Sequence, residues 1–372
     1  MPMKTEQEIM KNWYSSEFPL LSICCATYNH EFFIEKCLNG FLMQETNFPF
    51  EIIIHDDAST DKTVNIIQKY VKMFPTILRP IYESENQYSK GIKIYADIIF
   101  PYIRGKYVIF CDGDDYWTDP FKILKQINFL EKNKEYSMCF HPVYIKFEED
   151  KSKTNEIFPS PHYRKYNLSL TDLLNYNFPM RCSIVYRWRF NNKTELDILI
   201  KEYKNINIGG DYLLSLLHAE KGNIGFIDNV MVVYRKHKNG LWYNLNNTKT
   251  NEFYLKWGIK LINLYQMMEK RYNIDKSDEI NYIVCKYIYT LLDLQDFTRL
   301  KEFQDLYPEL YNSFLRTNLD VNFYQLLKLL LKYFKFIDIF LPEDIKRKKT
   351  VRSIISLLKL FKSINTKITI IT

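Results

Sequence analysis

The residues with the clearest chemical potential are acidic, and their densest group is Asp112-Gly113-Asp114-Asp115. This group directly follows an apolar run, 106–111, that is typical of a buried strand. Carboxylates this close repel one another, so the arrangement is unfavourable unless a cation or hydrogen-bond donors compensate. Oxygen ligands with an open side suit Mg²⁺ or Mn²⁺ shared with substrate phosphates. The alternative is an acidic turn that only caps the next helix.

A second acidic group, DDASTD at 56–61, follows the apolar run 50–55. Ser59 or Thr60 is expected to cap a helix that begins at Thr63. A cap does not explain the two adjacent acids before it. A carboxylate at this place can accept a hydrogen bond from a base N–H or from a ribose hydroxyl.

The elements around these groups alternate between strand and helix. Strands are expected at 20–27, 50–55, 78–82 and 106–111, and helices at 34–42, 63–74, 91–102 and 118–132. Pro120 is expected at the first position of the last helix. Continuous apolar strands that alternate with helices indicate an α/β fold with a mostly parallel sheet covered on both faces. Ligands bind beyond the carboxyl ends of such strands, where both acidic groups lie.

Composition narrows the class of protein. The 51 basic and 44 acidic residues give a net charge of +7, too small an excess to indicate a nucleic-acid partner. The seven cysteines are odd in number and show no CxxC spacing, which argues against a disulfide framework and a structural zinc site. No apolar leader and no apolar stretch long enough to span a membrane is visible. The expected location is therefore the cytoplasm.

Three segments in order, SICCATYNHEFFIEKCLNGFLMQ, EIIIHDDASTDKT and FCDGDDYW, resemble bacterial, non-processive family 2 glycosyltransferases of the GT-A fold. Ala58 stands where that family usually has Gly. The resemblance is strong over 20–120, weaker to about 245, and does not cover the last third of the chain. It implies an inverting enzyme that moves one hexosyl or N-acetylhexosaminyl residue from a nucleotide sugar, expected to be a UDP-sugar. The implied acceptor is a hydroxyl of a glycan or glycolipid, in bacterial surface polysaccharide or lipooligosaccharide synthesis.

The resemblance also implies roles for single residues. Asp114 would bind the Mn²⁺ or Mg²⁺ that bridges the donor diphosphate, and Asp115 would support it. The acidic pair at 56–57 would hold the uracil or ribose, and Asp112 would sit near the ribose. The complete nucleotide-binding set that the resemblance implies is Thr27, Asn29, Asp56, Asp57 and Asp112.

Two further site residues lie downstream. The segment IGGDYLL at 208–214 resembles the one that carries the general base of the family, which would be Asp211. Such a base contributes about 10²–10⁴-fold to rate; the alternative is a helix cap. The cationic segment YRKHKNGLW at 234–242 resembles one found in non-processive members, where His237 would bind the metal or donate to the leaving diphosphate. A structural histidine is the alternative for that residue.

The expected domains are a GT-A domain at 1–245 and an all-helical region at 246–372. The nucleotide-sugar half of the first would span about 18–120, and the acceptor half 121–245. The stretch 346–367 holds basic residues, no acidic residue and an apolar stripe. A basic amphipathic helix is typical of proteins at an anionic membrane surface, here the inner face of the plasma membrane. Packing of that helix on the protein body is the alternative.

Two other functions remain open on the sequence. A sugar-nucleotide pyrophosphorylase also binds nucleotide and metal, but it would need a Gly-rich triphosphate loop near the N-terminus, and residues 27–30 do not form one. A non-catalytic membrane-surface or interaction protein would use its acidic groups only as helix caps. Metal-dependent hydrolysis of a UDP-sugar separates the non-catalytic protein from either enzyme.

Overall fold

The computed structural model describes residues 4–14, 18–149, 154–190, 192–206, 210–240, 251–294 and 296–321. The chain divides into two compact units, Met1–Asn244 and Leu245–Thr372.

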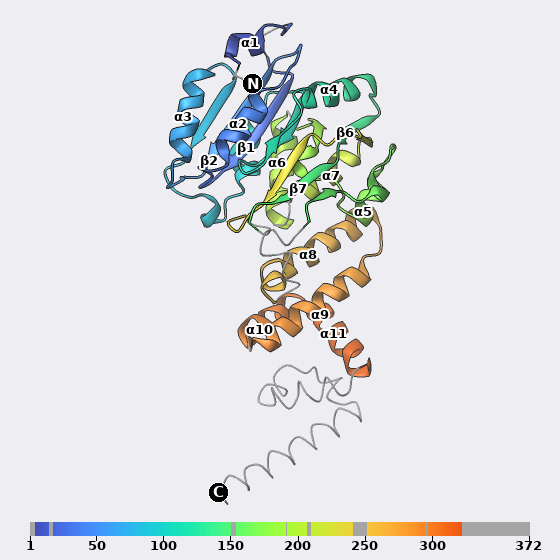
Figure 1. The fold of residues 1–372 in the computed structure, drawn as a ribbon. Coiled ribbons are helices and arrows are strands. Elements are labelled where there is room, and N and C mark those ends of the chain that lie inside the picture. Colours follow the sequence, from blue (N-terminus) through green and yellow to red (C-terminus); the bar gives the residue numbers. More distant parts are fainter. Residues whose placement is uncertain are drawn as a thin grey trace, which may run out of the picture. The chain divides into compact units, whose positions relative to one another are not determined.

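A mostly parallel sheet forms the centre of the first unit (Figure 1). Within the described residues its strand order is β10-β6-β9-β4-β1-β2-β3, and β9 alone runs antiparallel to both of its neighbours. The predicted α/β class with a mostly parallel sheet is therefore confirmed. The strands are β1 Leu21–Thr27, β2 Phe50–Asp56, β3 Leu78–Tyr82, β4 Tyr107–Phe110, β6 Tyr136–Phe140, β9 Val185–Arg187 and β10 Asn223–Phe226.

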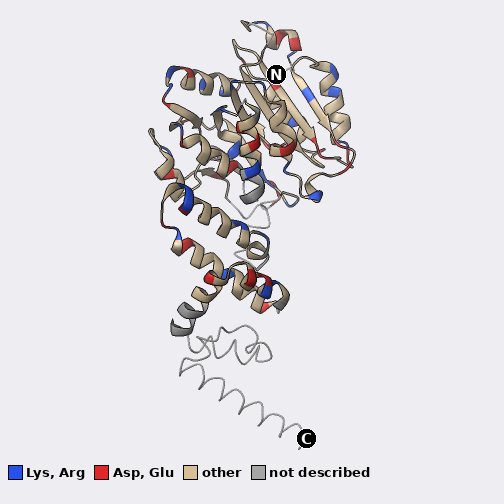
Figure 2. Ribbon diagram, turned by 180° about the vertical axis from the view of Figure 1, so that it is seen from behind, with Lys and Arg blue, Asp and Glu red and all other residues tan. Residues whose placement is uncertain are grey.

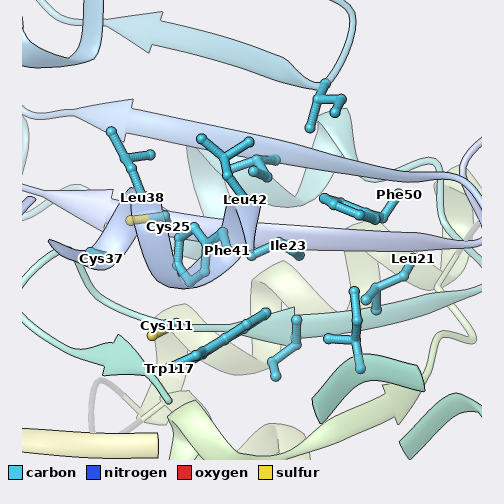
Figure 3. Close-up of a cluster of buried hydrophobic side chains, with 14 of the residues drawn as sticks. Leu21, Ile23, Cys25, Cys37, Leu38, Phe41, Leu42, Phe50, Cys111 and Trp117 are labelled. Atoms are coloured by element: carbon cyan, nitrogen blue, oxygen red, sulfur yellow. The ribbon is translucent and has the colours of Figure 1, made fainter. Parts of the chain in front are cut away.

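The helix α2, Ile34–Leu42, buries its apolar face against this sheet (Figure 3). Leu38, Phe41 and Leu42 pack in one cluster with Leu21 and Ile23 of β1, and all five are at most 2% exposed. The ring centroids of Phe41 and Trp117 lie 4.6 Å apart in an edge-to-face arrangement. The helix that the apolar spacing predicts is thus confirmed. Burial of each such side chain contributes about 1.5–3 kcal/mol to its stability.

Other helices of this unit match the prediction less closely. The helix predicted from 118 begins later, as α4 Lys122–Lys132. Asp119 Oδ1 accepts a hydrogen bond from the Phe121 N–H, so Pro120 lies in a turn and the prediction for it was wrong. The segment 91–102 contains a π-helical turn, Ile94–Ile99, and a 3₁₀ turn, Phe100–Tyr102. The remaining helices are α1 Glu6–Met10, α3 Thr63–Met73, α5 Leu170–Asn175, α6 Lys193–Ile206 and α7 Gly210–Ala219.

A second, smaller sheet has the order β5-β11-β7-β8. Its strands are β5 Tyr116–Trp117, β7 Val143–Phe147, β8 Glu156–Phe158 and β11 Val232–Lys236. The first of them directly follows the acidic group at 112–115, and it pairs antiparallel with β11. This pairing brings the residues just after β11 to the acidic loop.

The described part of the second unit is helical, as predicted. Its described helices are α8 Asn251–Tyr272, α9 Ser277–Asp293, α10 Phe297–Leu306 and α11 Pro308–Val321. Buried side chains of these helices, among them Ile262, Tyr287 and Phe303, form their own core. Acidic and basic residues both occur along the helices (Figure 2). No described helix is long and apolar enough to cross a bilayer. The predicted basic helix at 346–367 lies outside the described residues.

Candidate active site

The carboxyl ends of three parallel strands place the predicted nucleotide-binding residues and Asp114 at one edge of the sheet. Thr27, the last residue of β1, stands opposite Asp56, the last residue of β2. The Gly113 N–H donates to the Ala26 carbonyl over 2.9 Å, which sets the acidic loop after β4 beside the end of β1. The two acidic groups, far apart in the sequence, thus lie at the same edge of the sheet on either side of β1, as the parallel pattern predicts.

Asn29 ties the loop after β1 to the loop after β2. Its Oδ1 accepts from the Thr60 N–H over 2.8 Å, and its own N–H donates to Ser59 Oγ over 2.9 Å. Both loops contain a non-glycine residue in the left-handed region, with φ +53° at Asn29 and +60° at Ala58. Asparagine tolerates this conformation, whereas alanine is strained in it.

The acidic pair at 56–57 makes hydrogen bonds within the chain. Asp56 accepts from the Ser59 N–H over 2.9 Å and from the Ser59 hydroxyl over 2.6 Å. Burial raises the pKa of Asp56, although these two bonds act in the opposite direction. Asp57 accepts from the N–H groups of Gln87 and Tyr88 over 2.7 and 3.0 Å. Both carboxylates therefore shape the loops at this edge.

The predicted cap of α3 was wrong. Asp61 Oδ1, rather than a hydroxyl of Ser59 or Thr60, accepts from the Thr63 N–H over 2.9 Å. The Ser59 hydroxyl is used instead by Asp56, as donor to its carboxylate.

Asp114 and His237, which the sequence assigns together to a metal, lie in contact. Nε2 of His237 is 3.1 Å from Oδ2 of Asp114, and the side chains are 2% and 19% exposed, respectively. Burial opposes ionisation of Asp114, but the bond to His237 and the nearby His30 outweigh it and lower the pKa of Asp114. A carboxylate beside an imidazole is an O/N donor pair that Mn²⁺ accepts.

Asp115 has a different task. Its Oδ1 accepts from the Arg235 N–H over 2.9 Å, and its side chain is buried. Burial, followed by the charge of Asp114, raises the pKa of Asp115 well above its ordinary value. The bond fixes β11 against the acidic loop, so Asp115 helps to hold His237 in place.

Glycine is required inside the acidic loop. A Cβ on Gly113 would lie 2.8 Å from Thr27 Oγ1 and 3.0 Å from His30 Nδ1. Both of these polar atoms are buried and have no hydrogen-bond partner. His30 is a site residue that the sequence reasoning missed, although it directly follows Asn29 in a motif already assigned to the site.

Asp112 is engaged by two residues that the sequence did not connect with it. Its Oδ1 accepts from the Tyr95 hydroxyl over 2.6 Å, and its Oδ2 pairs with the Arg181 guanidinium. The guanidinium carbon lies 4.7 Å from the ring centroid of Tyr95. Tyr95 belongs to the π-helical turn inside the predicted helix at 91–102, and Arg181 belongs to a 3₁₀ turn, Arg181–Ser183. Neither turn has a spacing that links its residue to Asp112.

Asp211 lies in the first turn of α7 and is partly exposed. Its carbonyl accepts from the Ser215 hydroxyl over 2.9 Å, and Ser215 Oγ lies 2.8 Å from the Tyr186 hydroxyl of β9. The Tyr212 hydroxyl donates to the Leu173 carbonyl of α5 over 2.7 Å. These bonds fix the start of α7 on both sides. The neighbouring residues 207–209 lie outside the described part.

No group of three or more His, Cys, Asp or Glu side chains arranged to hold a metal occurs in the described residues. The pair Asp114 and His237 offers two ligands. Proteins often hold Mg²⁺ through one or two carboxylates, while substrate phosphates and water complete the shell. The Asp114 carboxylate therefore fits Mg²⁺ or Mn²⁺, and the imidazole nitrogen of His237 favours Mn²⁺ of the two.

Residues 22–190 match the family model described as glycosyl transferase family 2. The predicted resemblance to that family is thus confirmed over this part of the chain, which contains both acidic groups, while the roles of the single residues stay predictions.

The relatives and a solved structure give the following similarities. An uncharacterised protein of Mycobacterium tuberculosis strain H37Rv is 38% identical over 226 residues, covering 60% of this chain and 61% of that protein. The chain thus spans about three fifths of that relative. The Escherichia coli enzyme WfaP, a UDP-Glc:α-D-GlcNAc-diphosphoundecaprenol β-1,3-glucosyltransferase, is 34% identical over 151 residues, which is 41% of this chain and 55% of that enzyme. Staphylococcus aureus TarS 1–349 in complex with UDP-GlcNAc is 18% identical at a TM-score of 0.48, covering 88% of this chain and 82% of that one.

Proposed function

We propose that this protein is an inverting, metal-dependent glycosyltransferase that moves one sugar from a UDP-sugar to a hydroxyl of a glycan or lipid-linked acceptor. The observation that carries the proposal is the contact between His237 and Asp114, a residue of the segment that matches family 2. The neighbouring Gly113 packs against Thr27 at the carboxyl edge of the sheet. The name of WfaP, which states a UDP-Glc donor and a diphosphoundecaprenol-linked acceptor, supports both substrate classes. Assembly of a bacterial surface polysaccharide or lipooligosaccharide is the proposed setting.

The proposed reaction is a single displacement with Asp211 as general base. The Asp211 carboxylate takes the proton of the acceptor hydroxyl, whose oxygen forms a bond to the anomeric carbon. The bond between that carbon and the phosphate oxygen breaks, and UDP leaves. Because the attack comes from the face opposite the leaving group, the anomeric configuration inverts. Fixing of α7 through Tyr212 and Ser215 would keep the base in position.

The other proposed roles concern the leaving diphosphate and the nucleoside. Asp114 and His237 would hold the Mn²⁺ or Mg²⁺, which supplies positive charge to the departing diphosphate. Thr27, with its unpartnered buried hydroxyl, would line the nucleotide site. Asn29, just after β1, would line the same site, and Asp56 and Asp57, at the end of β2, would hold the uracil or ribose. The carboxylates among them have lone pairs left beyond their bonds to the loops.

The basic stretch 346–367 is proposed to bind an anionic membrane surface, where a lipid-linked acceptor would be found. This proposal stands on the sequence alone, because the stretch lies outside the described residues. A protein ending at residue 342 should lose binding to anionic liposomes and keep its affinity for UDP. Loss of both properties would make the helix part of the protein body.

The proposed function is tested by release of UDP from UDP-Glc, UDP-GlcNAc and UDP-Gal, with Mn²⁺ and then with EDTA. We expect UDP from at least one donor, and none after chelation. The same protein should not form a UDP-sugar from UTP and a sugar 1-phosphate. Formation of that product would identify the protein as a pyrophosphorylase. Failure to release UDP from any of the three donors would favour a non-catalytic function.

A further inference from the structure

We propose that Asp112 acts through Arg181: Asp112 and Tyr95 hold the guanidinium in place, and Arg181 binds a phosphate oxygen of the donor. Asp112 is then a positioning residue, and the nucleotide contact belongs to its partner. The inference rests on the proposed function, since it concerns the diphosphate of a UDP-sugar.

The first observation is the occupation of the Asp112 carboxylate. Its Oδ1 accepts from the Tyr95 hydroxyl, and its Oδ2 pairs with Arg181. Burial raises the pKa of Tyr95, so that hydroxyl stays protonated and remains a donor. The charge of Asp112 is therefore compensated within the chain. A carboxylate that binds a ribose or a metal would instead keep its oxygens free for that ligand.

The second observation is how firmly Arg181 is held. Its guanidinium carbon lies 4.7 Å from the centroid of the Tyr95 ring, while Asp112 pairs with the same group. A guanidinium held by a carboxylate and by an aromatic face loses little further freedom when it binds a ligand. The Arg181 side chain is nevertheless 29% exposed, so it can reach a bound substrate.

The third observation is the location of this cation. Asp112 and Asp114 are separated only by Gly113, so a diphosphate whose metal ion is held at Asp114 would lie close to the partner of Asp112. A guanidinium presents paired N–H donors that match phosphate oxygens. Arg235, a second arginine near the acidic loop, is buried at 5% exposure and lies over the Tyr116 ring at 4.5 Å. Arg181 is therefore the better placed of the two for a substrate phosphate.

The test compares the affinities of UDP and uridine by titration calorimetry in MnCl₂. Four full-length proteins are used: the wild type, Asp112→Asn, Arg181→Met and the double variant. Each single variant should weaken UDP binding by about tenfold or more, the scale of a charge-assisted hydrogen bond, and leave uridine binding unchanged. The double variant should bind UDP no more weakly than the worse single variant, because the two residues act as one unit.

Arg181→Lys is the conservative control, and it should recover part of the UDP affinity because it keeps the charge. Thermal melting of each protein shows whether it is folded. If Asp112→Asn does not fold, the UDP and uridine affinities of Arg181→Met alone test the inference. Equal weakening of uridine and UDP by Asp112→Asn, or wild-type UDP affinity in Arg181→Met, would overturn the inference. Failure of the wild-type protein to bind UDP would instead contradict the proposed function.

Discussion

Nε2 of His237 lies 3.1 Å from Oδ2 of Asp114, although 123 residues separate them along the chain. The contact exists because β5 and β11 pair with Val232 opposite Trp117, and because Asp115 accepts from the backbone of Arg235. The acidic loop and the residue after β11 are thereby held together.

Replacement of Asp114 should therefore remove the dependence of UDP binding on Mn²⁺. We expect Asp114→Ala to abolish release of UDP and to weaken UDP binding only when Mn²⁺ is present, because the carboxylate is one of the two proposed side-chain ligands. Asp305→Ala, which changes an exposed carboxylate in the second unit, is the control and should keep both properties. Calorimetry with and without Mn²⁺ measures the effect. Equal weakening in EDTA would show that Asp114 does not act through a metal.

Gly113 should tolerate no larger side chain. The added Cβ of Gly113→Ala would meet Thr27 Oγ1 at 2.8 Å and Thr27 Cβ at 2.9 Å, so the loop must shift. We expect a destabilisation of about 1–3 kcal/mol, as for other overpacked sites, and a loss of activity. Gly91→Ala provides a contrast, because its φ is +83° but its Cβ would meet nothing within 4 Å. That variant should be strained yet active; an active Gly113→Ala enzyme would contradict the packing described.

Ala58 is a position where stability can be gained. Its φ of +60° is unfavourable for an L-residue by about 1–2 kcal/mol, and glycine removes this strain. The greater entropy of glycine in the unfolded chain offsets about 0.5–1 kcal/mol of the gain. Ala58→Gly should therefore raise the free energy of unfolding by about 0.5–1 kcal/mol in urea titrations. Ala219→Gly, in the last turn of α7, should lower it. A destabilised Ala58→Gly protein would show that the left-handed turn is wrong.

Lys122 should make stability depend on pH. The side chain is fully buried, and Nζ donates to Gln126 Oε1 over 2.7 Å and lies 4.4 Å from the centre of the Trp117 ring. Burial lowers the pKa of Lys122 to about 7, against about 10.4 in an unfolded chain. Between these values the unfolded state binds more protons, so this group makes stability rise with pH.

The variant Lys122→Met removes that proton equilibrium. Relative to this variant, the wild type should gain free energy of unfolding as pH rises from about 7 to about 10. Lys301→Met, at an exposed lysine, should show no such trend. Urea unfolding across this pH range measures both. A constant difference for Lys122→Met would mean that the lysine is charged in the folded protein or that water reaches it.

The sequence predicts the first half of the sheet well and the second half poorly, for physical reasons. Strands β1, β2 and β4 are mainly apolar runs, and acidic groups stand at the ends of β2 and β4, so both the strands and the site edge can be recognised locally. The strand β9 is three residues long, antiparallel and contains Arg187, so nothing in its local composition distinguishes it from a loop. Short elements depend on their neighbours in the sheet, and those neighbours come from distant segments.

The same distinction applies to the candidate site. The resemblance names both Asp114 and His237 as site residues, because each lies in a recognisable motif, and the structure brings the two into contact. Their role as metal ligands stays a prediction. The partnership of Asp112 with Arg181 was not, because a side-chain ion pair over 69 residues leaves no trace in spacing. His30 was overlooked for another reason: an isolated histidine is commonly structural, and only the burial of its Nδ1 near Gly113 draws attention to it.

Transfer by a single displacement with Asp211 as base determines the anomeric configuration of the product, which can be measured. The enzyme is given the α-linked UDP-sugar that it uses fastest, with a GlcNAc-diphospholipid acceptor and Mn²⁺, and the new linkage is read by proton NMR. We expect a β-linked product from the wild type. We also expect Asp211→Asn to bind UDP normally but to form the product at least about 10²-fold more slowly. An α-linked product, or full activity in Asp211→Asn, would rule out this mechanism.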